Sequence, residues 1–148
     1  IKEEFMKTYK RKIVDQRFSL HDSKIIKIQK EEDDLVFFFD YGFVDIHENR
    51  MVEGRLRIKG YRPDDSSVYI IDYGDNLCGN PGKFTGKKMS LDDFIKNFNE
   101  NKMTLDVMTE YDAYGTYVLD GFLNMDMQCQ EVRLEIFYLM GQVYYEIG

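Results

Sequence analysis

The pattern of apolar and polar positions is clearest over residues 35–41, where apolar side chains occupy both alternating faces. Phe37 and Phe39 lie on the same face of this run, and the residues between them are also apolar. A strand that is apolar on both faces needs cover on both sides. We therefore predict a central strand, with Phe37 and Phe39 in the main core.

The run before it, residues 24–30, also alternates and predicts a strand with Ile26 and Ile28 on one buried face. Four acidic residues at 31–34 form the expected turn between the two strands. Gly42 predicts a bulge or bend, and Met140-Gly141 predicts a tight hairpin. Further alternating runs predict strands at 51–60 (Val52, Gly54, Leu56 and Ile58 inward), 67–73, 103–107, 117–127 (Tyr117, Leu119, Leu123, Met125 and Met127 inward), 132–138 and 142–147.

The periodicity changes to that of a helix at residues 90–100. Ser90 is the predicted N-cap, and Asp92 and Asp93 follow in the first turn, where the helix dipole favours negative charge. One apolar stripe should face the core: Leu91, Phe94, Ile95 and Phe98.

The N-terminal stretch, residues 1–16, has apolar residues at every fourth position from Ile1 to Ile13. This spacing favours a short helix. A first strand over residues 12–18 is the alternative.

Together these elements predict a single domain over residues 1–148, of the α+β class and mainly antiparallel β. We expect a sandwich or open barrel of about eight strands, with the helix at about 90–100 packed across it. The 11 Phe and 11 Tyr agree with a strand-rich fold.

Composition also bears on location. The chain has no apolar run of the ~18 residues that a membrane span needs, and its first residues lack the apolar stretch of a signal peptide. Cys78 and Cys129 do not form a Cys-x-x-Cys pair, which favours two free thiols in a reducing cytoplasm. We expect a cytoplasmic protein with no membrane contact.

The charge of −7 is unevenly distributed. Residues 1–30 hold nine Lys/Arg and four Asp/Glu, whereas residues 101–148 hold two Lys/Arg and eight Asp/Glu. An acidic chain is a poor ligand for nucleic acid, so we expect no nucleic-acid binding. Tyr is favoured at binding hot spots and acids steer cationic partners, which predicts a basic protein partner. The candidate partner-binding residues are Asp106, Glu110, Tyr111, Asp112 and Tyr114, the last ones in a predicted loop.

Few motifs in the sequence indicate a catalytic, metal-binding or phosphate-binding site. His21-Asp22 resembles the core of metal phosphohydrolases, but the chain has two histidines in all, too few for such a site. We interpret His21 and Asp22 as structural, with side chains that bond the backbone at the start of a strand. The glycine-rich stretch 74–88 resembles a phosphate loop but fails the P-loop pattern at Lys88. We therefore predict no catalytic residue, cofactor or metal site.

The segment Phe18-Ser19-Leu20-His21-Asp22-Ser23-Lys24-Ile25 resembles the start of one family of immunity proteins of bacterial polymorphic toxin systems. Related uncharacterised domains have a similar Leu-His-Asp-Ser start. The resemblance covers about the first 45 residues. It implies a cytoplasmic, non-enzymatic protein that binds and neutralises a toxin.

The expected function is therefore a non-enzymatic protein-binding module, with immunity to a toxin as its leading specific case. The first alternative is a β-barrel carrier of a small apolar ligand. The second is an uncharacterised enzyme.

Overall fold

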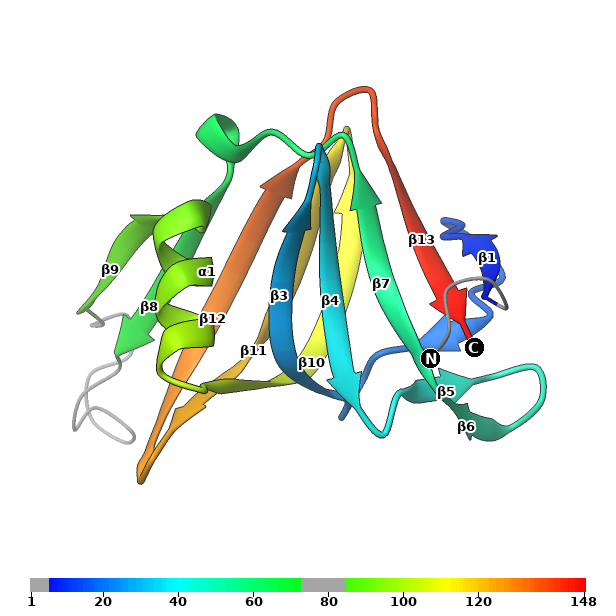
Figure 1. Cartoon of the computed structure of the whole chain (residues 1–148), viewed down its shortest axis with the longest axis horizontal. Coiled ribbons are helices and arrows are strands. Elements are labelled where there is room, and N and C mark those ends of the chain that lie inside the picture. The colour runs from blue at the N-terminus through cyan, green and yellow to red at the C-terminus, as the bar shows by residue number, and fades with distance from the viewer. Residues whose placement is uncertain (1–5, 73–84) are drawn as a thin grey trace.

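The computed structural model describes residues 6–72 and 85–148 (Figure 1). Within these residues, antiparallel strands make up most of the structure, together with one α-helix, α1 (Leu91–Glu100), and a short 3₁₀ helix, η2 (Pro63–Asp65). The predicted α+β, mainly antiparallel class is confirmed. The described residues contain thirteen strands rather than about eight, because several predicted runs are divided and short strands were missed.

Ten strands form one large sheet and three form a small one. The large sheet has the order β1 (Lys7–Lys10), β13 (Gln142–Ile147), β7 (Gly54–Lys59), β4 (Asp34–Asp40), β3 (Lys24–Glu31), β10 (Thr104–Ala113), β11 (Thr116–Met125), β12 (Gln128–Phe137), β8 (Ser67–Asp72) and β9 (Thr85–Ser90). The small sheet has the order β2 (Phe18–Ser19), β5 (Phe43–Asp45) and β6 (Arg50–Val52).

The large sheet is strongly curved and does not close on itself (Figure 1). Its inner face carries one cluster of buried apolar side chains, and α1 packs on this face against β3, β8 and β9. Among the described residues, no strand pairs with the outer edges of β1 and β9. The architecture agrees with the sandwich or open barrel that we predicted.

Helix α1 begins and ends where the sequence predicted. The Ser90 hydroxyl accepts a hydrogen bond from the Asp93 amide (3.1 Å), which satisfies one free N–H group of the first turn. The apolar stripe is buried in the core: Leu91, Phe94, Ile95 and Phe98.

The side chain of Asn99 joins the end of α1 to β3. Strand β3 pairs with β10 only through Lys24 and Ile25, so the rest of this edge of β3 needs other partners. Asn99 Nδ2 donates to the Ile28 carbonyl (2.6 Å), and the Ile28 amide donates to Asn99 Oδ1 (3.2 Å). The amide group thereby replaces a neighbouring strand at this position.

Strand β4 is internal, between β3 and β7, as its apolar pattern predicted. Phe37 is fully buried and Phe39 packs against the core while remaining half-buried. The prediction for Ile26 is wrong, because Ile25 and Ile28 are buried and Ile26 is exposed. A β-bulge in β3 places Ile26 as an extra residue between two consecutive positions of β4, and this reverses the alternation.

The predicted N-terminal helix is also wrong in the described part of that stretch. Residues 7–10 form β1, which pairs with β13, and Ile13 is exposed. Apolar residues four positions apart also share one face of a strand, so their spacing does not distinguish strand from helix. The alternative strand over 12–18 is wrong as well, since β2 begins at Phe18.

The bend predicted at Gly42 is confirmed, whereas the hairpin predicted at Met140-Gly141 is wrong. The chain turns at Tyr41 and Gly42, which both have positive φ, so the segment after β4 enters the small sheet. Met140-Gly141 does not form a hairpin, because β12 pairs with β8 and β11 whereas β13 pairs with β1 and β7. The curvature of the sheet explains this short connection: the end of β12 lies near the segment after β7, where the Arg62 amide donates to the Phe137 carbonyl (2.7 Å).

The other predicted strands hold with small changes. The run 51–60 has its predicted inward positions buried but is divided between β6 and β7. Met127 is exposed in the turn after β11 instead of facing inward. Thr85–Lys88, placed in a loop by the sequence, belongs to β9, and the remaining loop residues 74–84 lie outside the described residues.

Candidate protein-binding face

A second β-bulge determines which side chains of β10 face the core. The register between β10 and β11 shifts between Val107 and Thr109, so Met108 is the extra residue. Before the bulge Leu105 and Val107 face inward, and after it Glu110 faces inward. Simple alternation from Val107 would have placed Glu110 and Asp112 on the outer face.

Glu110 and Asp112 instead form a polar cluster with Arg11 inside the curved sheet. Arg11 Nη1 lies 3.4 Å from Glu110 Oε1, and Arg11 Nε lies 3.2 Å from Asp112 Oδ1. The Arg11 and Glu110 side chains are nearly buried, and that of Asp112 is mostly buried. Because Arg11 precedes these acids by about a hundred residues, the sequence did not show that it pairs with both of them.

Three tyrosines complete this cluster. The hydroxyls of Tyr117 and Tyr145 donate to the two oxygens of Glu110 (2.6 and 2.9 Å), and that of Tyr138 donates to Asp112 Oδ2 (3.1 Å).

These contacts change the titration of several groups. Burial raises the pKa of the Glu110 carboxyl, although Arg11 and the two tyrosine hydroxyls oppose this shift. Burial, followed by the charge of Asp112, raises the pKa of Tyr138 to about 12. The cluster is a buried network, and Glu110 has no oxygen free to steer a partner.

The outer face of β10–β12 carries a different group of acids. Registers across the three strands align Tyr111 with Val118 and Glu135, and Asp106 with Phe122 and Glu131. Tyr111 is 43% exposed and Phe122 is 37% exposed. We call this surface the acidic-aromatic face and define it by Asp106, Tyr111, Val118, Asp120, Phe122, Glu131, Arg133 and Glu135.

Carboxylates outnumber guanidinium groups on this face. Arg133 makes two contacts with Asp120, from Nε to Oδ1 (2.8 Å) and from Nη2 to Oδ2 (3.2 Å), so this pair is close to neutral. Asp106 accepts a hydrogen bond from the neutral amide of Asn124 (2.8 Å), and its partner on the neighbouring strand β3 is Lys24. With Glu131 and Glu135, the face has four carboxylates against one guanidinium.

The five candidate residues are therefore not brought together. Asp106 and Tyr111 lie on the acidic-aromatic face, whereas Glu110 and Asp112 belong to the buried cluster. Tyr111 and Asp112 lie in β10 and not in a loop. Tyr114 lies in the turn after β10 and is fully exposed. Their role in binding a partner stays a prediction.

Three residues of the face were not predicted: Phe122, Glu131 and Glu135. The sequence prediction considered only the inward positions of β11 and β12, although the same alternation identifies the outward ones.

His21 and Asp22 lie at the start of β3, next to the bulge of β10. His21 Nδ1 is 2.7 Å from the Met108 carbonyl, and the Asp22 amide donates to the Val107 carbonyl (2.8 Å). Both side chains are exposed and lie 3.4 Å apart. These backbone contacts agree with a structural role, although for Asp22 the contact is made by its main chain.

Within residues 6–72 and 85–148, no group of three or more His, Cys, Asp or Glu side chains could hold a metal ion. No described helix is long and apolar enough to cross a membrane. Cys129 is an exposed free thiol, and Cys78 lies outside the described residues.

Comparison with known proteins adds no relative: no family model matches the chain, and no curated protein or solved structure does.

Proposed function

We propose that this chain is a non-enzymatic protein-binding module that contacts a basic partner through its acidic-aromatic face. The observation that carries the proposal is the combination of half-exposed aromatic rings with a surplus of carboxylates on one sheet surface. Aromatic side chains supply buried contact area in an interface, and uncompensated carboxylates accelerate encounter with a cationic protein. Within the described residues, no helix or strand packs over this face.

The specific case is neutralisation of a toxin in the bacterial cytoplasm, which the resemblance at residues 18–25 suggests. Under this proposal the partner is a basic protein, and the chain needs neither a cofactor nor a catalytic residue. The product of the gene directly upstream is the first partner to test.

The experiment compares two variants that change the net charge equally. The face variant is Asp106→Lys with Glu131→Lys and Glu135→Lys. The control replaces exposed acids of other elements, in the turn between β3 and β4 and at the end of α1: Glu32→Lys, Asp33→Lys and Glu100→Lys. Glu110 and Asp112 are left unchanged, because a lysine beside buried Arg11 would unfold the chain.

Association with the upstream gene product is measured at several salt concentrations. We expect the face variant to associate more slowly and to depend less on salt than the wild type, and to neutralise the toxin less well. The control variant should change the association rate much less. If the face variant keeps the affinity and the salt dependence of the wild type, the acids only solvate the surface and the proposal fails.

A further inference from the structure

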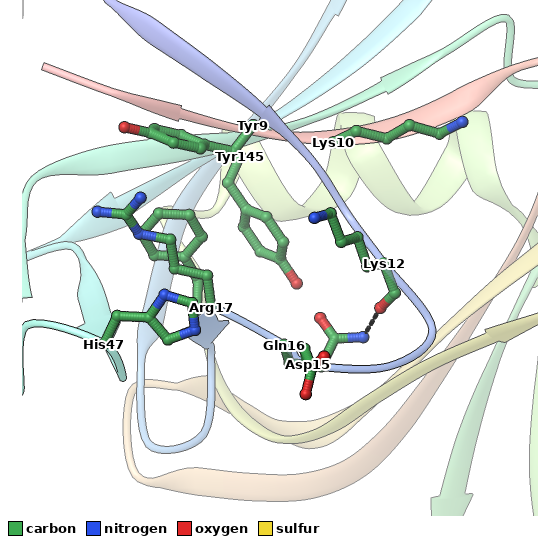
Figure 2. A pocket seen from close by; sticks show the side chains of 9 residues that line it. Tyr9, Lys10, Lys12, Asp15, Gln16, Arg17, His47 and Tyr145 are labelled. Atoms are coloured by element: carbon green, nitrogen blue, oxygen red, sulfur yellow. Dashed lines mark hydrogen bonds between the residues drawn. The ribbon is translucent and has the colours of Figure 1, made fainter.

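A cavity of about 220 Å³ lies on another side of the molecule, between the N-terminal segment and the turn that joins β5 to β6 (Figure 2). Its walls include the aromatic rings of Tyr9, Phe18 and Tyr145. These rings pack against one another, with centroids 5.4 Å apart for Tyr9 and Phe18 and 5.1 Å apart for Phe18 and Tyr145. The cavity therefore has a firm apolar wall.

Three cationic side chains and one imidazole surround this wall. Lys10, Lys12 and Arg17 line the cavity together with His47, against the single carboxylate of Asp15. In Figure 2 the ammonium of Lys12 lies on the side of Tyr145, whereas that of Lys10 points away. In a chain with a net charge of −7, this concentration of cations is exceptional and does not serve the contact with a basic partner.

One buried carboxylate positions two of these groups. Asp45 Oδ2 accepts hydrogen bonds from Arg17 Nε (3.4 Å) and Nη2 (3.2 Å). Asp45 Oδ1 accepts from the amides of His47 (3.0 Å) and Glu48 (3.1 Å), which fixes the turn that carries the imidazole. The Asp45 side chain is only 2% exposed. Its two oxygens therefore hold Arg17 and His47 at the same wall before any ligand arrives, and such preorganisation reduces the entropy lost on binding.

The guanidinium of Arg17 keeps donors available. Its carbon lies 4.7 Å from the centroid of Tyr9 and 5.4 Å from that of Phe18, so the group is held against the aromatic wall. Among the described residues Nη1 has no hydrogen-bond acceptor, and the Arg17 side chain is 32% exposed. An incoming anion can bind there without breaking the pair with Asp45.

We propose that this cavity binds a small organic anion, a carboxylate on a compact aromatic or apolar body. Lys12, Arg17 and His47 would contact the carboxylate, and the rings of Tyr9, Phe18 and Tyr145 would contact the body. The volume is below the roughly 300–1,000 Å³ of sites for drug-sized ligands, so the ligand is small. This inference does not rest on the proposed protein partner.

The test is a titration of the ¹⁵N-labelled protein with benzoate, followed by NMR at low ionic strength. Benzyl alcohol serves as the neutral analogue and inorganic phosphate as the anion without an apolar body. We expect benzoate to shift the amide signals of residues around the cavity, and to bind about tenfold or more tightly than either control, as expected for a charge-assisted contact added to ring burial.

Two variants locate the site. Lys12→Ala should weaken benzoate binding by about tenfold, the effect of removing one charge-assisted contact. Lys96→Ala removes an exposed lysine of α1 that does not line the cavity and should leave the affinity unchanged. His47→Ala removes the imidazole that is proposed to contact the carboxylate together with Lys12, and it should also weaken benzoate binding.

Three results would overturn the proposal. They are the absence of shifts at millimolar benzoate, equal binding of benzoate and phosphate, and equal effects of Lys12→Ala and Lys96→Ala. Absence of shifts would exclude a binding site, and equal binding of phosphate would exclude a contribution from the aromatic wall. Equal effects of the two lysine variants would mean that benzoate binding depends only on the net charge of the protein.

Discussion

Glu110 and Asp112 show how one inserted residue changes the role of its neighbours. The sequence predicts exposed acids after the strand at 103–107, with Asp112 in a loop, but the bulge at Met108 turns both toward Arg11. A buried carboxyl group with shared hydrogen bonds affects stability and its dependence on pH, whereas an exposed one mainly affects encounter with partners.

Glu110 should make stability fall as the pH rises. Its raised pKa means that the folded chain binds this proton more tightly than the unfolded chain, whose value is near 4.5. The contribution is therefore fully present below 4.5 and is lost as the pH rises through the folded-state pKa. We expect the free energy of unfolding of the wild type, minus that of Glu110→Gln, to decrease from pH 4.5 upward in urea titrations.

The comparison with Glu110→Gln is needed because Asp45 acts in the opposite direction. Although burial opposes its ionisation, the bond from Arg17 and the amides of Glu48 and His47 hold the pKa of Asp45 below its usual value. Subtracting the variant removes this common contribution. A difference that stays flat or increases with pH would contradict the prediction for Glu110.

His21→Ala should have a small effect. Its side chain is 56% exposed and makes one hydrogen bond to the Met108 carbonyl, so we expect a loss of about 0.5–1 kcal/mol in the free energy of unfolding. This is less than the ~1–2 kcal/mol that a buried hydrogen bond would give. Tight zinc or manganese binding by the wild type, lost in His21→Ala, would show that His21 is a ligand instead.

At the scale of elements, periodicity located α1 and most strands but not the bulges. Alternation over Lys24–Lys30 does not show which isoleucines face the core, because either Ile25 or Ile26 could share a face with Ile28 if a bulge lies between them. The pairing of β3 with β4 determines the answer. The partners of β13 could not be predicted either, since a short connection usually joins paired strands. The buried side chains of α1 were predictable because the N-cap and the apolar stripe both depend only on residues within one ten-residue helix.

The bulge in β3 gives neighbouring isoleucines opposite sensitivities. Ile25 is fully buried and Ile25→Ala should lower the free energy of unfolding by about 2–5 kcal/mol. Ile26 is 44% exposed, so Ile26→Ala should change it by about 0.5 kcal/mol or less. Equal losses in chemical denaturation would mean that the bulge is absent.

Asn99→Ala tests the junction of α1 with β3. The substitution leaves the amide and carbonyl of Ile28 without their partners, so we expect a loss of about 1–3 kcal/mol and faster hydrogen exchange at the Ile28 amide. Asn101→Ala removes exposed bonds within α1 only and is the matched control. If Ile28 exchange is unchanged in Asn99→Ala, water replaces the side chain without loss.

At the scale of the whole molecule, the sign of a surface cannot be read from the charge of a segment. Residues 101–148 carry eight acids, but two of them share the charge of Arg11, one pairs with Arg133, and Glu146 pairs with Arg55 and Arg57. The free edges of the open sheet, β1 and β9, carry Lys7, Lys10, Lys87 and Lys88. Lysines on exposed edges discourage pairing with the edges of other chains.

The position of β13 between β1 and β7 also determines when the chain can fold. Lys7 pairs with Ile147, so during synthesis β1 and β7 are made early and keep unpaired edges until β13 is made. Such long sequence separations slow folding, because the loop must close before the contacts form.

We expect a chain shortened after Gly141 to lose its cooperative unfolding transition, whereas the full chain should refold with a slow, single phase in stopped-flow measurements. A shortened chain that still unfolds cooperatively would show that β13 is added to a finished sheet. Until β13 has left the ribosome, the nascent protein exposes two unpaired strand edges, and such edges are templates for pairing with other chains.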